Sequence, residues 1–177
     1  MKGNEQVINQ LNKRLAALLL ALIVMTSPTA TRAAEAPVAP NGITLISGYR
    51  SWEAIAPSYR DDKNQIRVIL GNPVVIEAMK QNVRPFPDGS IMAKVAWSAV
   101  KHPKFPAATV PGSFSQVEFM VKDSVLYRET GGWGFARFVG YDLKPYGKNP
   151  GFVQECFSCH QPVKSNDYVF TGFAAVP

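Results

Sequence analysis

Residues 90–100 read SIMAKVAWSAV, and the alternation of their side chains predicts a β-strand. One face of this strand carries Ile91, Ala93, Val95 and Trp97, and the other carries Met92, Lys94, Ala96 and Ser98. The strand follows PFPDG at residues 85–89, a turn sequence in which Gly89 can take the positive φ that a turn requires. An apolar face opposite a mixed face is typical of an antiparallel sheet.

Three further segments have the composition of strands, namely residues 65–70, 114–122 and 133–141. In the second segment Gln116, Glu118, Met120 and Lys122 share one face. In the third, the face formed by Gly134, Ala136, Phe138 and Gly140 is nearly bare of side chains. That face predicts a surface on which a flat, rigid group could lie against the backbone.

Short helical segments are expected between these strands, at residues 48–55 and 74–82, with a helical turn at 123–129. The proline-rich residues 102–113 are expected to form a loop. The connections are too short for repeated crossovers between parallel strands. The sequence therefore predicts an α+β fold, a β-rich single domain with an antiparallel sheet and short helices.

The motif that carries chemistry lies near the C-terminus, where residues 156–160 read CFSCH. This is the attachment sequence of a c-type haem, in which Cys156 and Cys159 add to the porphyrin vinyl groups and His160 binds the iron. One haem per chain is expected. The alternatives are a disulfide or redox motif and a zinc site. A structural zinc site needs about four ligands, and a thioredoxin-like motif belongs early in a βαβ unit.

The sixth iron position separates electron transfer from ligand chemistry. Met79, Met92, Met120 and His102 are the available ligands, and none has a persuasive context. The methionines are typical of a core, and His102 lies in the expected loop. An open distal site that binds a small molecule is therefore preferred, and a low-spin electron carrier with His102 as second ligand is the alternative.

The N-terminus predicts export. Lys13 and Arg14 precede an apolar run from residue 15 to 25, and small residues follow, which indicates a signal peptide at 1–33. A flexible leader at 34–42 and a folded domain at 43–177 are expected after it. The apolar run is shorter than the ~20 residues of a membrane span, so no membrane span is expected after cleavage.

The net charge of +6 does not indicate a nucleic-acid partner. The signal peptide removes four basic residues and one acidic residue, which are Lys2, Lys13, Arg14, Arg32 and Glu5. The remaining Lys and Arg residues are scattered rather than gathered in a stripe. A hydrophobic fraction of 46% excludes a disordered chain and allows a real core.

Seven short blocks occur in the order seen in the cytochrome P-460 family, which the chain resembles over nearly all of the residues after the leader. The blocks are YRSW at 49–52, QIR at 65–67, PDGSIMAK at 87–94, VEFMVKD at 117–123, GWGF at 132–135, ECFSCH at 155–160 and NDYVFT at 166–171. The resemblance implies a β-rich, homodimeric, periplasmic cytochrome in which His160 binds the iron and the distal site is open.

The resemblance also implies a reaction. Family members of the enzyme type oxidise hydroxylamine or nitric oxide, pass the electrons to a partner cytochrome, and carry a third covalent tie from a Lys side chain to the porphyrin. The matching position here is Lys94. A related branch, cytochrome c-prime-beta, lacks the cross-link and binds nitric oxide without turnover. On the residues alone, an ordinary solvated lysine on the outer face of an antiparallel sheet is the favoured interpretation of Lys94.

Arg67 and Glu118 match charged positions of the family. The resemblance suggests that Arg67 pairs with a haem propionate or donates to a bound nitrogen oxide, and that Glu118 accepts protons. A mutual salt bridge or solvated strand charges are the alternatives. Some members place a carboxylate just before the attachment motif, but residues 148–154 contain none. Phe86 or Phe152 could instead cap an apolar gas site.

Overall fold

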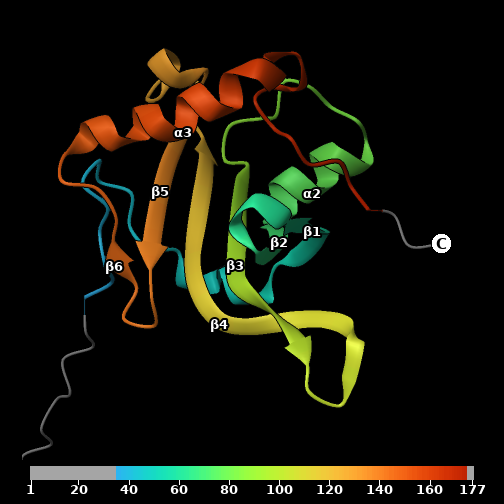
Figure 1. The fold of residues 1–177 in the computed structure, drawn as a ribbon. Helices are drawn as coiled ribbons and strands as arrows, with labels where there is room; N and C mark the ends of the chain where they lie inside the picture. The colour runs from blue at the N-terminus through green and yellow to red at the C-terminus, as the bar shows by residue number, and fades with distance from the viewer. Residues whose placement is uncertain (1–34, 175–177) are drawn as a thin grey trace, which may run out of the picture. The chain divides into compact units, whose positions relative to one another are not determined.

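The computed structural model describes residues 35–174, so the expected signal peptide lies outside the described residues. Its six strands form one antiparallel sheet in which the spatial order follows the chain order (Figure 1). The strands are β1 Glu53–Arg60, β2 Gln65–Gly71, β3 Ile91–His102, β4 Phe105–Lys122, β5 Trp133–Val139 and β6 Lys144–Pro145. The predicted β-rich α+β fold is confirmed.

Residues 35–174 also form two α-helices, of which α2 connects β2 to β3 and α3 follows the last strand. Helix α2, Pro73–Lys80, begins after Asn72, whose side chain accepts a hydrogen bond from Val75 N at 3.1 Å. Helix α3 spans Val153–His160. The 3₁₀ turns are η2 Ser47–Ser51, η3 Asp61–Lys63, η4 Arg128–Thr130, η5 Pro150–Phe152 and η6 Gln161–Asn166. No helix within residues 35–174 is long and apolar enough to cross a membrane.

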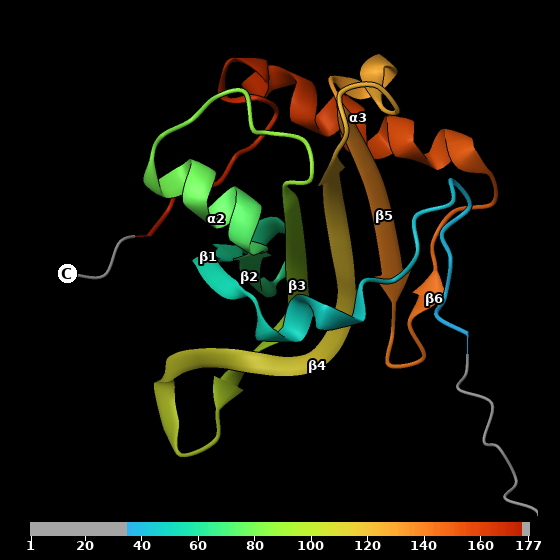
Figure 2. The same ribbon diagram turned by 180° about the vertical axis from the view of Figure 1, so that it is seen from behind.

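The sheet has a packed cluster on each face. Helices α2 and α3 contribute to one cluster, which contains Ile69, Met92 and Phe135 from the strands and lies under α3 in Figure 1. The opposite cluster contains Val95, Phe119 and Phe138 and is covered by η2, as Figure 2 shows from behind. Strands β2, β3, β4 and β5 therefore divide their side chains between two cores, as period-two alternation requires.

The segment before η2 belongs to the second cluster. Ala39 and Ile43 are buried there, and Val38 pairs with Thr44 in an isolated bridge. The Asn41 side-chain amide donates to the backbone carbonyl of Phe135 at 2.9 Å. Several of the residues expected to form a leader are thus packed against the sheet.

Two local predictions were wrong. Only residues 47–51 of the expected helix at 48–55 are helical, and the rest enters β1, an edge strand that tolerates Pro57. The expected loop at 102–113 is mostly strand, because β3 and β4 form a long hairpin. Its register shifts between Trp97 and Ala99, and irregularities of this kind allow prolines within paired strands.

The bare face of β5 was also assigned the wrong role. Tyr127 covers Gly134 so closely that a Cβ at position 134 would lie 2.5 Å from its ring. Phe138 on the same face is fully buried beside Phe119, with ring centroids 6.0 Å apart. The chain's own aromatic side chains therefore use the space that the small residues leave.

Phe119 tests the importance of this second core. Phe119→Ala should lower the free energy of unfolding by about 3–5 kcal/mol, because it empties a fully packed site. Phe105→Ala, at a position that is 61% exposed on the hairpin, should change it by less than about 0.5 kcal/mol. Urea denaturation of both variants measures the difference, and equal losses would contradict the assignment of the core.

Candidate functional site

The attachment motif forms the last five residues of helix α3. In a helix, residues three and four positions apart are neighbours on one face, so Cys159 and His160 lie one turn beyond Cys156. Both cysteines are free thiols, with Cys156 half-buried and Cys159 exposed. None of the residues of α3 is fully buried, although the helix lies across the sheet. The motif is thus presented on a helix whose surface is only partly covered.

His160 is oriented by a backbone carbonyl. Its Nδ1 lies 2.6 Å from the carbonyl oxygen of Tyr168, and its ring packs beside Phe135 and Phe170 at centroid distances of 5.4 and 5.1 Å. A carbonyl can only accept, so Nδ1 carries the proton and Nε2 keeps its lone pair. Burial lowers the pKa of His160, and the bond to Tyr168 opposes that effect. A neutral imidazole with a free Nε2 is the form that binds a metal.

A row of charged side chains crosses the sheet face beneath α3. Lys94 on β3 pairs in register with Glu118 on β4, which pairs with Arg137 on β5. The Glu118 carboxylate forms ion pairs with Lys94 Nζ and with Arg137 Nε, the latter at 2.7 Å. It also accepts a hydrogen bond from the Gln116 amide at 2.6 Å. One carboxylate therefore holds two cations on a partly buried surface.

This row faces the attachment motif. Burial raises the pKa of the Cys156 thiol. The positive charge of Arg137 lowers that pKa, and it is the largest contribution from any charged group. The charge of Glu118 raises the pKa of both Cys156 and His160, and the charge of Lys94 lowers both. The structure thus brings Lys94 and Glu118, two residues singled out in the sequence, into electrostatic range of Cys156 and His160.

Arg67 occupies the same sheet face one strand further on. It lies on β2 between Ala96 on β3 and Ser58 on β1. Its Nε and the Ser58 hydroxyl are buried and have no hydrogen-bond partner among residues 35–174, and burial lowers the pKa of its guanidinium. Arg67 and Glu118 do not form a mutual salt bridge, because Glu118 is paired with Lys94 and Arg137. An unpaired guanidinium at this position is suited to an acidic group of a ligand.

These residues fit a c-type haem. Two free thiols and an imidazole with a free Nε2 lie on one helix, and an unpartnered Arg67 Nε lies on the facing sheet. Cys156 and Cys159 would hold the group, His160 would bind its iron, and Arg67 would pair with one of its carboxylates. Zinc has less support, because within residues 35–174 no three His, Cys, Asp or Glu side chains gather around one point.

His102 lies far from this site. It ends β3, eight residues beyond Lys94 and therefore about 26 Å further along an extended strand. Figure 1 shows the hairpin that carries it directed away from α3. Its Nδ1 accepts a hydrogen bond from Lys104 N at 3.2 Å. His102 is thus poorly placed to share an iron with His160.

The other side chains considered for the distal position have different surroundings. Met92 and Met120 pair in register on the face that carries Lys94, whereas Met79 is buried on α2. Phe86 is buried against Trp133, with ring centroids 5.9 Å apart, and Phe152 is buried against Tyr146. Of these side chains, Met92 and Met120 lie beside the charged row. Phe86 belongs to the cluster that also contains Met92, and Phe152 belongs to the cluster on the opposite face.

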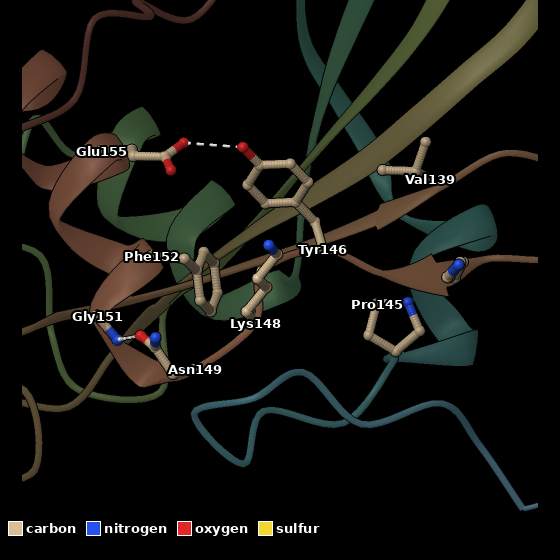
Figure 3. Close-up of a pocket in the computed structure, with 10 residues that line it drawn as sticks. Val139, Pro145, Tyr146, Lys148, Asn149, Gly151, Phe152 and Glu155 are labelled. Atoms are coloured by element: carbon tan, nitrogen blue, oxygen red, sulfur yellow. Dashed lines mark hydrogen bonds between the residues drawn. The ribbon is translucent and has the colours of Figure 1, made fainter.

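An open pocket of the described residues lies elsewhere. It has a volume of about 690 Å³ and is lined by residues of β6 and of the segment leading into α3, Phe152 among them (Figure 3), but by none of Arg67, Lys94, Glu118, Cys156, Cys159 and His160. Glu155 at its rim accepts a hydrogen bond from the Tyr146 hydroxyl at 3.0 Å. The reactive and charged groups of the site therefore converge outside this pocket.

Two components of the site were not predicted from the sequence. Arg137 lies on the face of segment 133–141 opposite Gly134 and Ala136, and the sequence alone assigns it no role. The Tyr168 carbonyl left no signal, since any residue supplies a carbonyl and only the fold brings this one to His160. Arg137 could have been found by aligning the alternating faces of segments 114–122 and 133–141.

One family model matches the chain. It is described as Cytochrome P460 and covers residues 46–171, from just before η2 to just beyond the segment that contacts His160. None of the curated proteins compared with the chain matches it. The matched range includes every residue placed in the site above.

Glu118 tests the charged row. Glu118→Gln should lower the free energy of unfolding by about 3 kcal/mol, because it leaves Lys94 and Arg137 as two partly buried like charges without their partner. Glu53→Gln removes the carboxylate of an exposed pair with Lys80 and should have no measurable effect. Thermal or urea unfolding compares the variants, and a Glu118→Gln protein as stable as the control would show that the row contributes nothing.

Proposed function

The chain belongs to the cytochrome P460 family, and from that premise we propose that it is an exported c-type haem protein that oxidises hydroxylamine, nitric oxide or both. The observation that carries the proposal is the placement of an oriented, neutral His160 within range of the Lys94–Glu118 pair. When bound, haem supplies a redox-active iron that can accept electrons from a nitrogen compound.

The residues of α3 have the holding role. The thiols of Cys156 and Cys159 keep the group attached, which matters outside the cytoplasm because a free cofactor would diffuse away. His160 supplies Nε2 from one side. The bond from Nδ1 to the Tyr168 carbonyl fixes the ring's tautomer and raises its basicity as a ligand.

Lys94 and Glu118 have the proton-handling role. A third covalent tie through Lys94 Nζ would require the neutral amine and a two-electron oxidant such as a peroxide, because two hydrogens are lost when it forms. The paired Glu118 carboxylate is placed to take the proton of Nζ. Arg137 and Gln116 hold the same carboxylate from its other oxygen. Glu118 is therefore positioned to accept protons released from a substrate such as hydroxylamine.

A second function, nitric oxide binding without turnover, is favoured by a different observation. Next to the charged row lies an apolar row in which Met92 pairs with Met120 and Met120 with Phe135. Apolar walls of this kind suit a small uncharged gas. The lack of a carboxylate in residues 148–154 agrees with this alternative.

The expected partners extend the proposal. We propose that electrons leave through a partner cytochrome in the periplasm and that the protein is a homodimer. The β3–β4 hairpin offers apolar side chains for a dimer contact, since Val100 and Phe105 on it are 43% and 61% exposed.

Lys94 tests the third covalent tie. The exported protein should carry one haem and show a strongly red-shifted ferrous Soret band, with an intact mass lower than that of a two-thioether adduct by the hydrogens lost in cross-linking. Lys94→Ala should restore the ordinary band and mass. Lys101→Ala, at an exposed position on the same strand, is the control. A wild-type spectrum already identical to that of Lys94→Ala would rule out the tie.

Turnover separates the two functions. With hydroxylamine and an artificial electron acceptor, the wild type should be active, and Glu118→Gln should lower kcat by about 100-fold through loss of the proton acceptor. Nitric oxide binding, followed optically, should persist in that variant. A wild type that binds nitric oxide but does not oxidise hydroxylamine would favour the gas-binding function.

A further inference from the structure

We propose that Lys122 and Asp167 are positioning residues, and that their buried ion pair holds the Tyr168 carbonyl against His160 Nδ1 and thereby sets how strongly His160 donates to iron. The inference rests on the proposed function, because it concerns an iron bound at His160. It adds a control element that lies outside the attachment motif and outside the Lys94–Glu118–Arg137 row.

The ion pair is almost fully enclosed. Lys122 Nζ lies 2.8 and 2.9 Å from the two carboxylate oxygens of Asp167, and the side chains are 5% and 8% exposed. Nζ also donates to the carbonyl of Gly131 at 3.2 Å. A buried pair of this kind is firm only while both members are present, since either charge alone is poorly solvated. The last residue of β4, Lys122, is thus bonded to Asp167, which lies 45 positions later in the sequence.

Asp167 is also bonded to two other parts of the fold. Its Oδ2 accepts a hydrogen bond from Phe86 N at 2.8 Å, and its backbone carbonyl accepts one from Trp133 Nε1 at 2.9 Å. Lys122 Nζ lies 4.9 Å from the centroid of the Trp133 ring. Asp167 is therefore fixed from the turn before β3, from the start of β5 and from the end of β4.

This anchorage supports an unusual backbone conformation. Asp167 and Tyr168 both have positive φ values, 51° and 63°, which are uncommon for residues other than glycine. Such conformations persist only where the surroundings impose them. The Tyr168 ring packs on Gly131, where a Cβ would lie 2.2 Å from it. The two left-handed residues lead directly to the Tyr168 carbonyl that accepts from His160.

The consequence for His160 follows from the strength of that hydrogen bond. A short bond from Nδ1–H to a fixed carbonyl draws the proton away from the ring and makes Nε2 a stronger donor. If Asp167 loses its anchor, the two left-handed residues can relax and the carbonyl can move. The hydrogen bond then weakens, and the imidazole becomes a poorer donor to ferric iron.

The test uses haem-loaded, full-length protein with Lys122→Met, Asp167→Asn and the double variant. The ferrous iron–histidine stretching band, measured by resonance Raman spectroscopy, should shift to lower frequency in all three. The reduction potential should shift upwards, because a weaker donor stabilises ferric iron less. The double variant leaves no uncompensated buried charge, so it keeps the measurement possible if a single variant fails to fold.

Two controls separate positioning from general loss of stability. Val117→Ala empties a fully buried site in the cluster on the opposite face of the sheet, and Lys80→Met breaks the exposed pair with Glu53. Neither should move the Raman band or the potential. Band and potential unchanged in foldable Lys122 and Asp167 variants would overturn the proposal alone. A wild type without haem on Cys156 and Cys159 would overturn it together with the proposed function.

Discussion

The register of β3, β4 and β5 is the constraint on which the rest of the site depends. Antiparallel pairing places Lys94, Glu118 and Arg137 in one row across three strands, beneath the helix that carries Cys156 and His160. A slip of one residue would send the central strand's side chains to the opposite core. The apolar alternation that packs both cores therefore also places one carboxylate between two cations.

The other side of the site is built by different physics. No strand register reaches His160, whose orientation comes from the Tyr168 carbonyl in an irregular segment. That segment takes two consecutive left-handed residues, and buried polar bonds to Asp167 hold it in place. Sheet register thus places the groups to which we assign proton handling, while a buried ion pair fixes the carbonyl that accepts from the imidazole proposed to bind iron.

Patterns local in the sequence predicted part of this arrangement. Period-two alternation assigned Lys94 and Glu118 to their strand faces, and the spacing of Cys156, Cys159 and His160 singled out the segment that ends helix α3. Contacts between distant segments were beyond such patterns, as Asp167 shows, because its partners come from β4, β5 and the turn before β3. The prediction that a flat group lies on the small-residue face of β5 failed for the same reason, since Tyr127 from a separate turn fills that space. Prolines in the hairpin suggested a loop because an irregular strand pair that tolerates them leaves no local signal.

The most direct test of the central claim is a crystal structure of the mature, haem-loaded protein. We predict iron bound to His160 Nε2, Nδ1 still bonded to the Tyr168 carbonyl, and the porphyrin between α3 and the sheet face that carries Lys94. Haem lying against the opposite face, beside Val95 and Phe138, would contradict the assignment of the site. Iron bound by His102 would contradict it equally.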